Sequence, residues 1–242
     1  LAKNLFEWLP YVALDQVSQL AFGAHNFFEM LEVACRHVYS THKRTNRGEL
    51  GEILLHIACV EHFSTFPILC KLTLKTASND TAKGFDGIYV VPKQNDFEIW
   101  LGESKFYRQA NRAIKDAVKS ITEHILPDFI TAEKAMITAH VDDKAPFFSD
   151  IKKILRQKTS ADVLLKKAVF PVLIAYNSRA CASHTDLTKE YVQELTRETK
   201  RLHDLFAKRA ESLKLQFRLI FAPLSTKKTV VDNFDSLLRP YL

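Results

Sequence analysis

The chain has 242 residues, 47% of them hydrophobic, and a formal net charge of +6 at pH 7. This length and apolar content predict one α/β domain over residues 1–242, with a helical scaffold over 1–45, a core over 46–225 and a tail over 226–242. The basic excess suits a polyanionic partner. The apolar runs have strand length and no signal peptide is recognisable, so we expect no membrane partner.

The cysteines lack the spacing of a metal site, and three of the four lie in apolar runs, where a free cysteine behaves as a small hydrophobic residue. They are Cys35, Cys59, Cys70 and Cys181. Reduced cysteines are typical of cytoplasmic proteins, and this is the location that we expect. Because the chain starts with leucine, we expect the natural protein to begin before Leu1.

Residues 1–40 predict helices, one of them beginning at Phe27 after an Asn26 cap. A basic segment follows and leads to the next element. This segment is either a solvated face or a patch that steers phosphate groups. Its members are Arg36, His37, His42, Lys43, Arg44 and Arg47. Arg47 is the candidate here for contact with nucleic acid.

Residues 48–62 predict a second helical stretch with two acids near its start. Glu52 is the candidate functional acid, and Glu49 is its competitor. A structural role is the alternative for both, because acids at a helix N-terminus stabilise the helix dipole. His56 follows Glu52 by one turn and is more typical of a packed or exposed side chain than of a ligand.

Residues 66–74 predict a buried strand, and a loop over 77–80 leads to a hairpin with its turn at 93–96. Both faces of the hairpin are apolar, which favours a central strand pair covered by helices on each side. One face carries Ile88, Val90, Ile99 and Leu101, and the other carries Phe85, Tyr89, Val91 and Trp100.

A turn centred on Gln94-Asn95 would place Asp86 opposite Glu103, with Cβ atoms roughly 4.5–5.5 Å apart. Lys105 follows Glu103 by two residues and would point to the same face. Two carboxylates this close resist joint ionisation unless a proton or a cation lies between them.

Mg²⁺ is the cation that we expect at these acids, because it binds one or two carboxylates together with phosphate oxygens and waters. Mn²⁺ is expected to substitute. A lysine beside such an ion can orient or polarise a water, so the set of Asp86, Glu103 and Lys105 suits phosphodiester hydrolysis. The alternative is a surface hairpin with a cross-strand salt bridge.

The next segment predicts a helix that runs from Tyr107 to about Ile125. Its start carries Arg108, Gln109 and Arg112, which would lie beside the proposed metal site. These side chains and the first amides of the helix could bind phosphates. An ordinary solvated face is the alternative.

The rest of the chain predicts further parallel strands. Pro127 ends the preceding helix, and two short helices follow over 149–155 and 161–165, with basic residues that suit nucleic-acid contact, partner docking or solubility equally. Strands over 168–176 and 215–223 flank a helix over 187–213 capped by Asp186, which predicts a parallel crossover. A basic loop at 227–228 and a short apolar tail end the chain. The fold class is therefore α/β with a mixed sheet of about five strands.

Three stretches together resemble the core of the PD-(D/E)xK nuclease superfamily, the fold of restriction endonucleases. They are Arg-Gly-Glu-Leu-Gly-Glu at 47–52, Gly-Phe-Asp-Gly at 84–87 and Trp-Leu-Gly-Glu-Ser-Lys-Phe-Tyr at 100–107. Their amino-acid sequences resemble those of HamA, the effector subunit of the Hachiman anti-phage system, which works with the helicase HamB. The similarity covers residues 20–225, roughly. Phe85 stands where the superfamily motif has proline, at a position that varies widely.

The resemblance implies a restriction-endonuclease-like core and roles for individual residues. Asp86 and Glu103 would bind Mg²⁺, with the Ser104 carbonyl as a further ligand, and Lys105 would position the attacking water. The Gly48-x-x-x-Glu52 spacing matches the first-helix motif of the superfamily and would bring Glu52 to the metal.

The expected function is DNA hydrolysis with little sequence preference and no small-molecule substrate, because no element for reading bases is evident. A HamB-like helicase is the partner that the resemblance implies. Two alternatives stay open. One is a catalytically silent nuclease fold that binds DNA or regulates the helicase, and the other is a nuclease that acts alone in repair or restriction.

Overall fold

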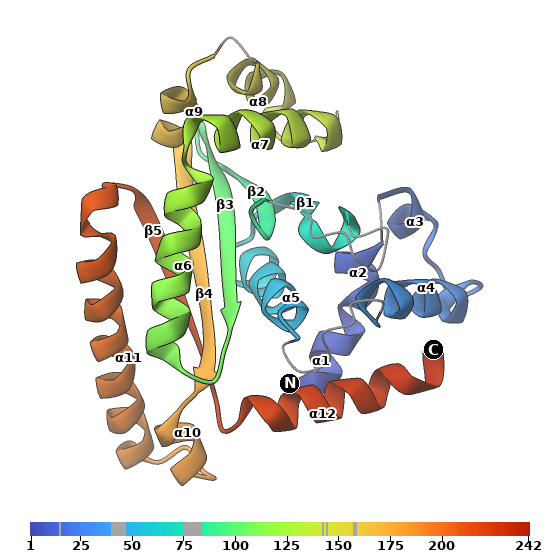
Figure 1. The fold of residues 1–242 in the computed structure, drawn as a ribbon. Coiled ribbons are helices and arrows are strands. Elements are labelled where there is room, and N and C mark those ends of the chain that lie inside the picture. The colour runs from blue at the N-terminus through green and yellow to red at the C-terminus, as the bar shows by residue number, and fades with distance from the viewer. Residues whose placement is uncertain (15, 40–46, 75–83, 142, 144, 157–158) are drawn as a thin grey trace.

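Figure 1 shows the computed structural model of the chain, in which helices cover both faces of one sheet. The described residues are 1–14, 16–39, 47–74, 84–141, 143, 145–156 and 159–242. The predicted basic residues 42–44 and the predicted loop over 77–80 lie outside them. None of the helices in the described part is long and apolar enough to cross a membrane.

The sheet has five strands in the order β1-β2-β3-β4-β5, and it is mixed as predicted. Their bounds are β1 Phe66–Cys70, β2 Gly87–Pro92, β3 Phe97–Phe106, β4 Ala168–Asn177 and β5 Gln216–Leu224. The pairs among β1, β2 and β3 are antiparallel, whereas β3, β4 and β5 run parallel. The first strand is shorter than predicted, because residues Lys71–Leu74 form the 3₁₀ turn η2.

The hairpin register is as predicted over the six pairs from Gly87–Gly102 to Pro92–Phe97. The predicted pairing of Asp86 with Glu103 is wrong, because the ladder ends before it and the Asp86 amide donates to the Gly102 carbonyl at 2.8 Å. Gly84, two residues before Asp86, has a φ of +146°, a backbone conformation that residues with a side chain rarely adopt. The chain therefore enters the hairpin irregularly.

The face prediction is wrong for Phe85 as a consequence of this entry. Phe85 packs in the cluster that contains Ile88 and Val90, and not in the cluster with Tyr89. The other buried residues of the hairpin alternate between the two faces as predicted, which is the pattern of a strand pair covered on both sides.

Two groups of helices cover the sheet (Figure 1). One group comprises α1 Ala2–Glu7, α2 Leu9–Ala13, α4 Phe27–Tyr39, α5 Glu49–Ile57 and α12 Lys227–Leu238. The other comprises α6 Ala110–His124, α7 Pro127–His140, α8 Phe148–Leu155, α9 Ala161–Lys167 and α11 Lys189–Ala210. The remaining elements are α3 Gln16–Ala21, α10 Arg179–Ser183, the π-helix η1 Ala58–His62 and the 3₁₀ turns η3 Glu211–Leu213 and η4 Arg239–Tyr241.

Three expectations about the helices are wrong. Helix α7 was not predicted, and Pro127 is its first residue, a position that suits proline because its missing N–H would have no partner there. The cap of α11 is Thr188, whose hydroxyl accepts from the Tyr191 amide at 3.1 Å, and not Asp186. The predicted basic loop and tail are the amphipathic helix α12.

Candidate active site

A cavity of about 790 Å³ brings together Glu52, Asp86, Glu103 and Lys105, which the sequence singled out. It lies between the end of β3, the start of α5, the segment before β2 and the α6–α7 junction. Its polar lining includes Glu52, Lys71, Asp86, Glu103, Ser104, Lys105, Ser120, Glu123, His124 and Asp128.

The cavity exists because one side of β3 loses its strand partner. Strand β2 pairs with β3 only as far as Gly102, while β4 continues along the other side to Phe106. The first turn of α5 approaches the uncovered side, where a Cβ on Gly51 would lie 3.1 Å from the Ser104 hydroxyl oxygen. A glycine at this position therefore allows α5 to come close to the strand.

Asp86 is buried, with 8% of its surface exposed, and its carboxylate has three partners. The Ser104 amide and hydroxyl donate to Oδ2 at 2.8 and 2.7 Å, and Lys71 Nζ lies 3.3 Å from Oδ1. Burial alone would raise the pKa of Asp86, but Lys71, Lys105 and the bonds from Ser104 outweigh it, so the pKa is lowered. Asp86 is therefore held ionised.

Glu103 is more buried, with 2% of its surface exposed, and it forms an ion pair with Lys105. This contact confirms that both side chains point to one side of the sheet. Burial and the nearby charge of Asp86 raise the pKa of Glu103 to about 7, although Lys105 opposes the shift. The two carboxylates thus repel each other across one cavity, a repulsion that a bound cation would relieve.

Glu52 lines the same cavity and is 8% exposed. Its charge, with those of Asp86 and Glu103, acts against burial to raise the pKa of Lys71. Its competitor Glu49 does not line the cavity and forms an ion pair with Arg47 at 2.9 Å.

The donor set fits a hard divalent cation. Within the described part of the chain, no three His, Cys, Asp or Glu side chains are arranged to hold a metal ion. Two carboxylates in an open cavity match Mg²⁺, which keeps several waters and binds substrate phosphates, better than an ion that needs a cage of protein ligands.

Arg47 does not have the position expected of a residue that contacts nucleic acid. It is buried, with 1% of its surface exposed, and its guanidinium also lies 2.5 Å from Asp235 of α12. Both charged partners hold it inside the protein, so its prediction as a contact residue is wrong. Its role is to join the start of α5 to α12.

The predicted basic residues at the start of α6 lie beside the first cavity and do not line it. Tyr107 lines the first cavity, whereas Arg108 and Gln109 line a second one. Arg112 is exposed, lies 3.8 Å from Asp116 on its own helix and lines neither cavity.

Sequence reasoning missed three residues at the site, namely Lys71, His124 and Glu133. Lys71 interrupts an apolar run, which was a usable signal. Burial and then Lys71 lower the pKa of His124 to about 4, so this histidine is neutral where its Nδ1 lies 3.8 Å from Glu103. Glu133 accepts from the Phe85 amide at 3.1 Å and thereby fixes the segment before Asp86.

Comparison with known proteins agrees with the family resemblance. The family model described as HamA matches residues 1–238. Anti-bacteriophage protein A of Escherichia coli (strain K12) is 23% identical over 209 residues, which cover 86% of this chain and 38% of that protein. The chain therefore spans well under half the length of this curated relative. No solved structure matches the chain. Since the HamA model covers nearly the whole sequence, the chain belongs to the HamA family.

Proposed function

We propose that this chain is a Mg²⁺-dependent nuclease that hydrolyses DNA phosphodiester bonds in defence against phages. The observation that carries the proposal is the convergence of Asp86, Glu103 and Lys105 on one open cavity. The defence role is supported by membership of the HamA family and by the name of the Escherichia coli relative.

The residues that would hold Mg²⁺ are Asp86 and Glu103, with the Ser104 carbonyl as a further ligand and Glu52 in support. Mn²⁺ would substitute for it. When bound, the ion would polarise the scissile phosphate and lower the pKa of a coordinated water. The raised pKa of Glu103 is consistent with this role, because a carboxylate that is hard to ionise alone gains most from a cation.

The chain's own groups would orient the reactants. The Lys105 ammonium, held next to Glu103, would donate hydrogen bonds to the attacking water and to a non-bridging phosphate oxygen. Ser104 fixes one oxygen of Asp86 through two hydrogen bonds, and so sets the direction of the carboxylate. Lys71 would add positive charge where the phosphate gains negative charge.

The partner that we propose is a HamB-like helicase, and the substrate is DNA with little sequence preference. The site supports the second point, because the groups that would meet the substrate are Lys71, Lys105 and a cation held by the acids, which suit phosphate, and phosphate contacts carry no sequence information. Cytoplasmic action, beside invading DNA, completes the proposal.

Plasmid degradation with the helicase present tests the proposal. We expect loss of supercoiled plasmid with Mg²⁺, none with EDTA, and a rate at least about 100-fold lower for Glu103→Gln and Lys105→Ala. Glu190→Gln and Lys119→Ala make the same charge changes at exposed helix positions and should retain activity.

Three results would contradict parts of the proposal. Intact plasmid in every lane, while the helicase hydrolyses ATP, would favour the catalytically silent regulatory module. Degradation that persists in Glu103→Gln would place the chemistry elsewhere. Strong cleavage by the chain without its partner would favour a nuclease that acts alone.

A further inference from the structure

A second cavity, of about 800 Å³, lies where the parallel strands β3 and β4 end. Its basic lining consists of four arginines, Arg108, Arg179, Arg197 and Arg201, which we call the arginine cavity. In open α/β sheets, ligands bind outside the carboxyl ends of the strands, which is where this cavity lies. The connection from β3 to α6 borders both cavities, because Tyr107 lines the first and Arg108 the second.

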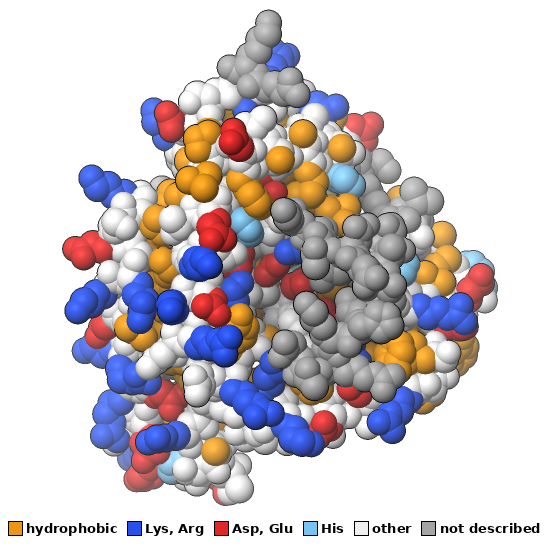
Figure 2. Space-filling view, in the orientation of Figure 1, with side chains coloured by type: hydrophobic (Ala, Val, Ile, Leu, Met, Phe, Trp, Pro, Cys, Tyr) orange, Lys and Arg blue, Asp and Glu red, His pale blue; other side chains and the backbone are white. Residues whose placement is uncertain are grey.

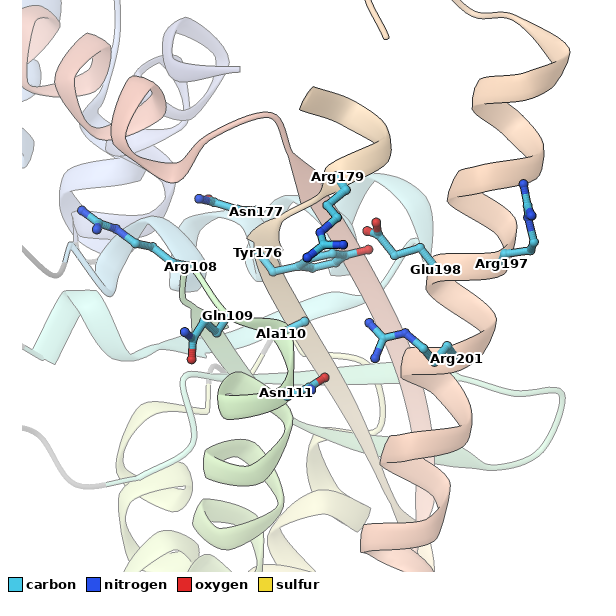
Figure 3. A pocket seen from close by; sticks show the side chains of 10 residues that line it. All are labelled: Arg108, Gln109, Ala110, Asn111, Tyr176, Asn177, Arg179, Arg197, Glu198 and Arg201. Atoms are coloured by element: carbon cyan, nitrogen blue, oxygen red, sulfur yellow. The ribbon is translucent and has the colours of Figure 1, made fainter. Parts of the chain in front are cut away.

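One carboxylate, that of Glu198, lines the cavity with the arginines. None of the ion pairs among the described residues involves the four arginines, so their guanidinium donors are not engaged by acids. Figure 3 shows Arg179 and Arg201 extending from different elements toward the middle of the cavity, while Arg108 and Arg197 extend outward. Such a concentration of positive charge stabilises an anion.

Two further groups of donors line the same cavity. Helix α6 begins there, and its N-cap Gln109 makes no side-chain cap hydrogen bond and no acid occupies its first turn. The amides of that turn and the positive end of the helix dipole are therefore available to an anion.

The second group is the Tyr176 hydroxyl, which is buried beside the Glu198 carboxylate. It lies opposite Glu198 (Figure 3). Burial, followed by a hydrogen bond to Glu198, raises the pKa of Tyr176, so its phenol stays neutral and donates toward the carboxylate that faces the cavity.

We propose that the arginine cavity binds phosphate groups of a nucleic-acid strand whose cleavage site lies in the first cavity. This inference rests on the proposed function for the identity of the ligand. Arginine matches phosphate with paired hydrogen bonds, and the two cavities share the β3–α6 connection as a common border. Figure 2 shows that Lys and Arg side chains also gather over α6 and α11, a diffuse positive charge that would attract a nucleic acid without fixing its position.

Binding without cleavage tests the inference. Fluorescence anisotropy of a labelled single-stranded oligonucleotide would be measured with the whole chain in EDTA, between 50 and 200 mM salt. We expect Arg179→Ala/Arg201→Ala to bind about tenfold more weakly. The slope of log affinity against log salt should also become shallower by about 1.4, which corresponds to two lost contacts with a single strand.

Two variants serve as controls. Lys208→Ala/Arg209→Ala removes the same charge from exposed positions of α11, the helix that carries Arg201, outside the cavity, and should weaken binding less than about twofold. Arg179→Lys/Arg201→Lys keeps the charge and should retain the salt slope, but it should lose affinity because an ammonium cannot form the paired bonds.

Several outcomes would overturn the inference: no binding by the wild type, equal losses in the alanine and control pairs, or equally good competition by AMP or by polyglutamate. Competition by AMP would show a small phosphorylated ligand, and competition by polyglutamate would show an acidic protein segment. Failure of plasmid degradation alone would refute the proposed function and not this inference, since anisotropy requires no hydrolysis.

Discussion

Replacement of Lys71 with methionine should expose the electrostatic balance of the first cavity. The Lys71 ammonium lies 3.3 Å from Asp86 and also donates to the Gly84 carbonyl at 3.2 Å. Methionine has a similar length and no charge, so Asp86 would stay buried without its nearest cation.

The magnitude follows from the geometry. At an effective dielectric constant of about 20, two unit charges 3.3 Å apart attract each other by about 5 kcal/mol. The substitution also removes the cost of burying an ammonium, and Ser104 still bonds to Asp86. We therefore expect a net loss of about 2–3 kcal/mol in the free energy of unfolding. For a chain of this size that lowers the melting temperature by about 4–12 °C.

The loss should depend on pH in a defined way. The folded-state pKa of Asp86 is lowered, so its stabilisation is present above the unfolded pKa of about 4 and disappears as pH falls through the folded value. The pKa of Lys71 is raised, so its stabilisation is complete below about 10 and disappears as pH rises further. The full loss is expected between these limits.

Thermal unfolding of both proteins from pH 3 to pH 9 checks this prediction. Lys119→Met is the matched control, since Lys119 is exposed and lies 3.7 Å from Glu123, and it should change stability by less than about 1 kcal/mol. A loss for Lys71→Met that is the same at pH 3 and pH 7, or no loss at all, would refute the reasoning.

Three further predictions address other parts of the fold and site. Arg47→Ala should lower the free energy of unfolding by about 3–5 kcal/mol, because it leaves buried Glu49 without its cation. An unchanged melting temperature with impaired DNA binding would instead support Arg47 as a residue that contacts nucleic acid. Gly102→Ala should lower the free energy of unfolding by about 1–3 kcal/mol, because its Cβ would lie 2.8 Å from Leu55 Cδ2. In a Leu55→Ala background the same substitution should cost less in thermal unfolding, and additive losses would contradict the proposed clash. The Mg²⁺ affinity measured by calorimetry should fall about tenfold per pH unit below pH 7, because Glu103 takes up a proton there. The Glu103→Gln variant should not show this dependence. Equal wild-type affinities at pH 5.5 and 8 would argue against Glu103 as a ligand.

The hairpin could be predicted because its information is local. A short turn, alternating apolar residues and a two-residue spacing between Glu103 and Lys105 fix the register and the shared face. The entry to the hairpin could not be predicted, since Asp86 takes its position from Ser104, Lys71 and the support of Glu133 behind Phe85.

Helix α7 could not be predicted because half of the residues on its buried face are charged. Ile130, Glu133, Lys134 and Ile137 have helical spacing, but periodicity counts only the two isoleucines as core. Lys134 is buried because its ammonium donates to the carbonyls of Arg156 and Thr159, contacts that no local pattern reveals.

Arg47 illustrates the same limit from the opposite direction. A basic residue in a basic segment suggests a surface that contacts phosphate, yet its burial depends on Glu49 two residues later and on Asp235 far along the chain. Burial of a charge depends on partners far along the chain, and composition does not report them.

Helix α12 holds both walls of the first cavity at once. Asp235 engages Arg47 just before α5, and the Lys227 ammonium donates to the Phe106 carbonyl at the end of β3 at 2.6 Å. Displacement of this helix would leave Arg47 with Glu49 as its remaining acid and would remove the ammonium donor from the Phe106 carbonyl. Deformation of the site from this side would therefore disturb both walls together, and a ligand that binds α12 would act on both of them at once.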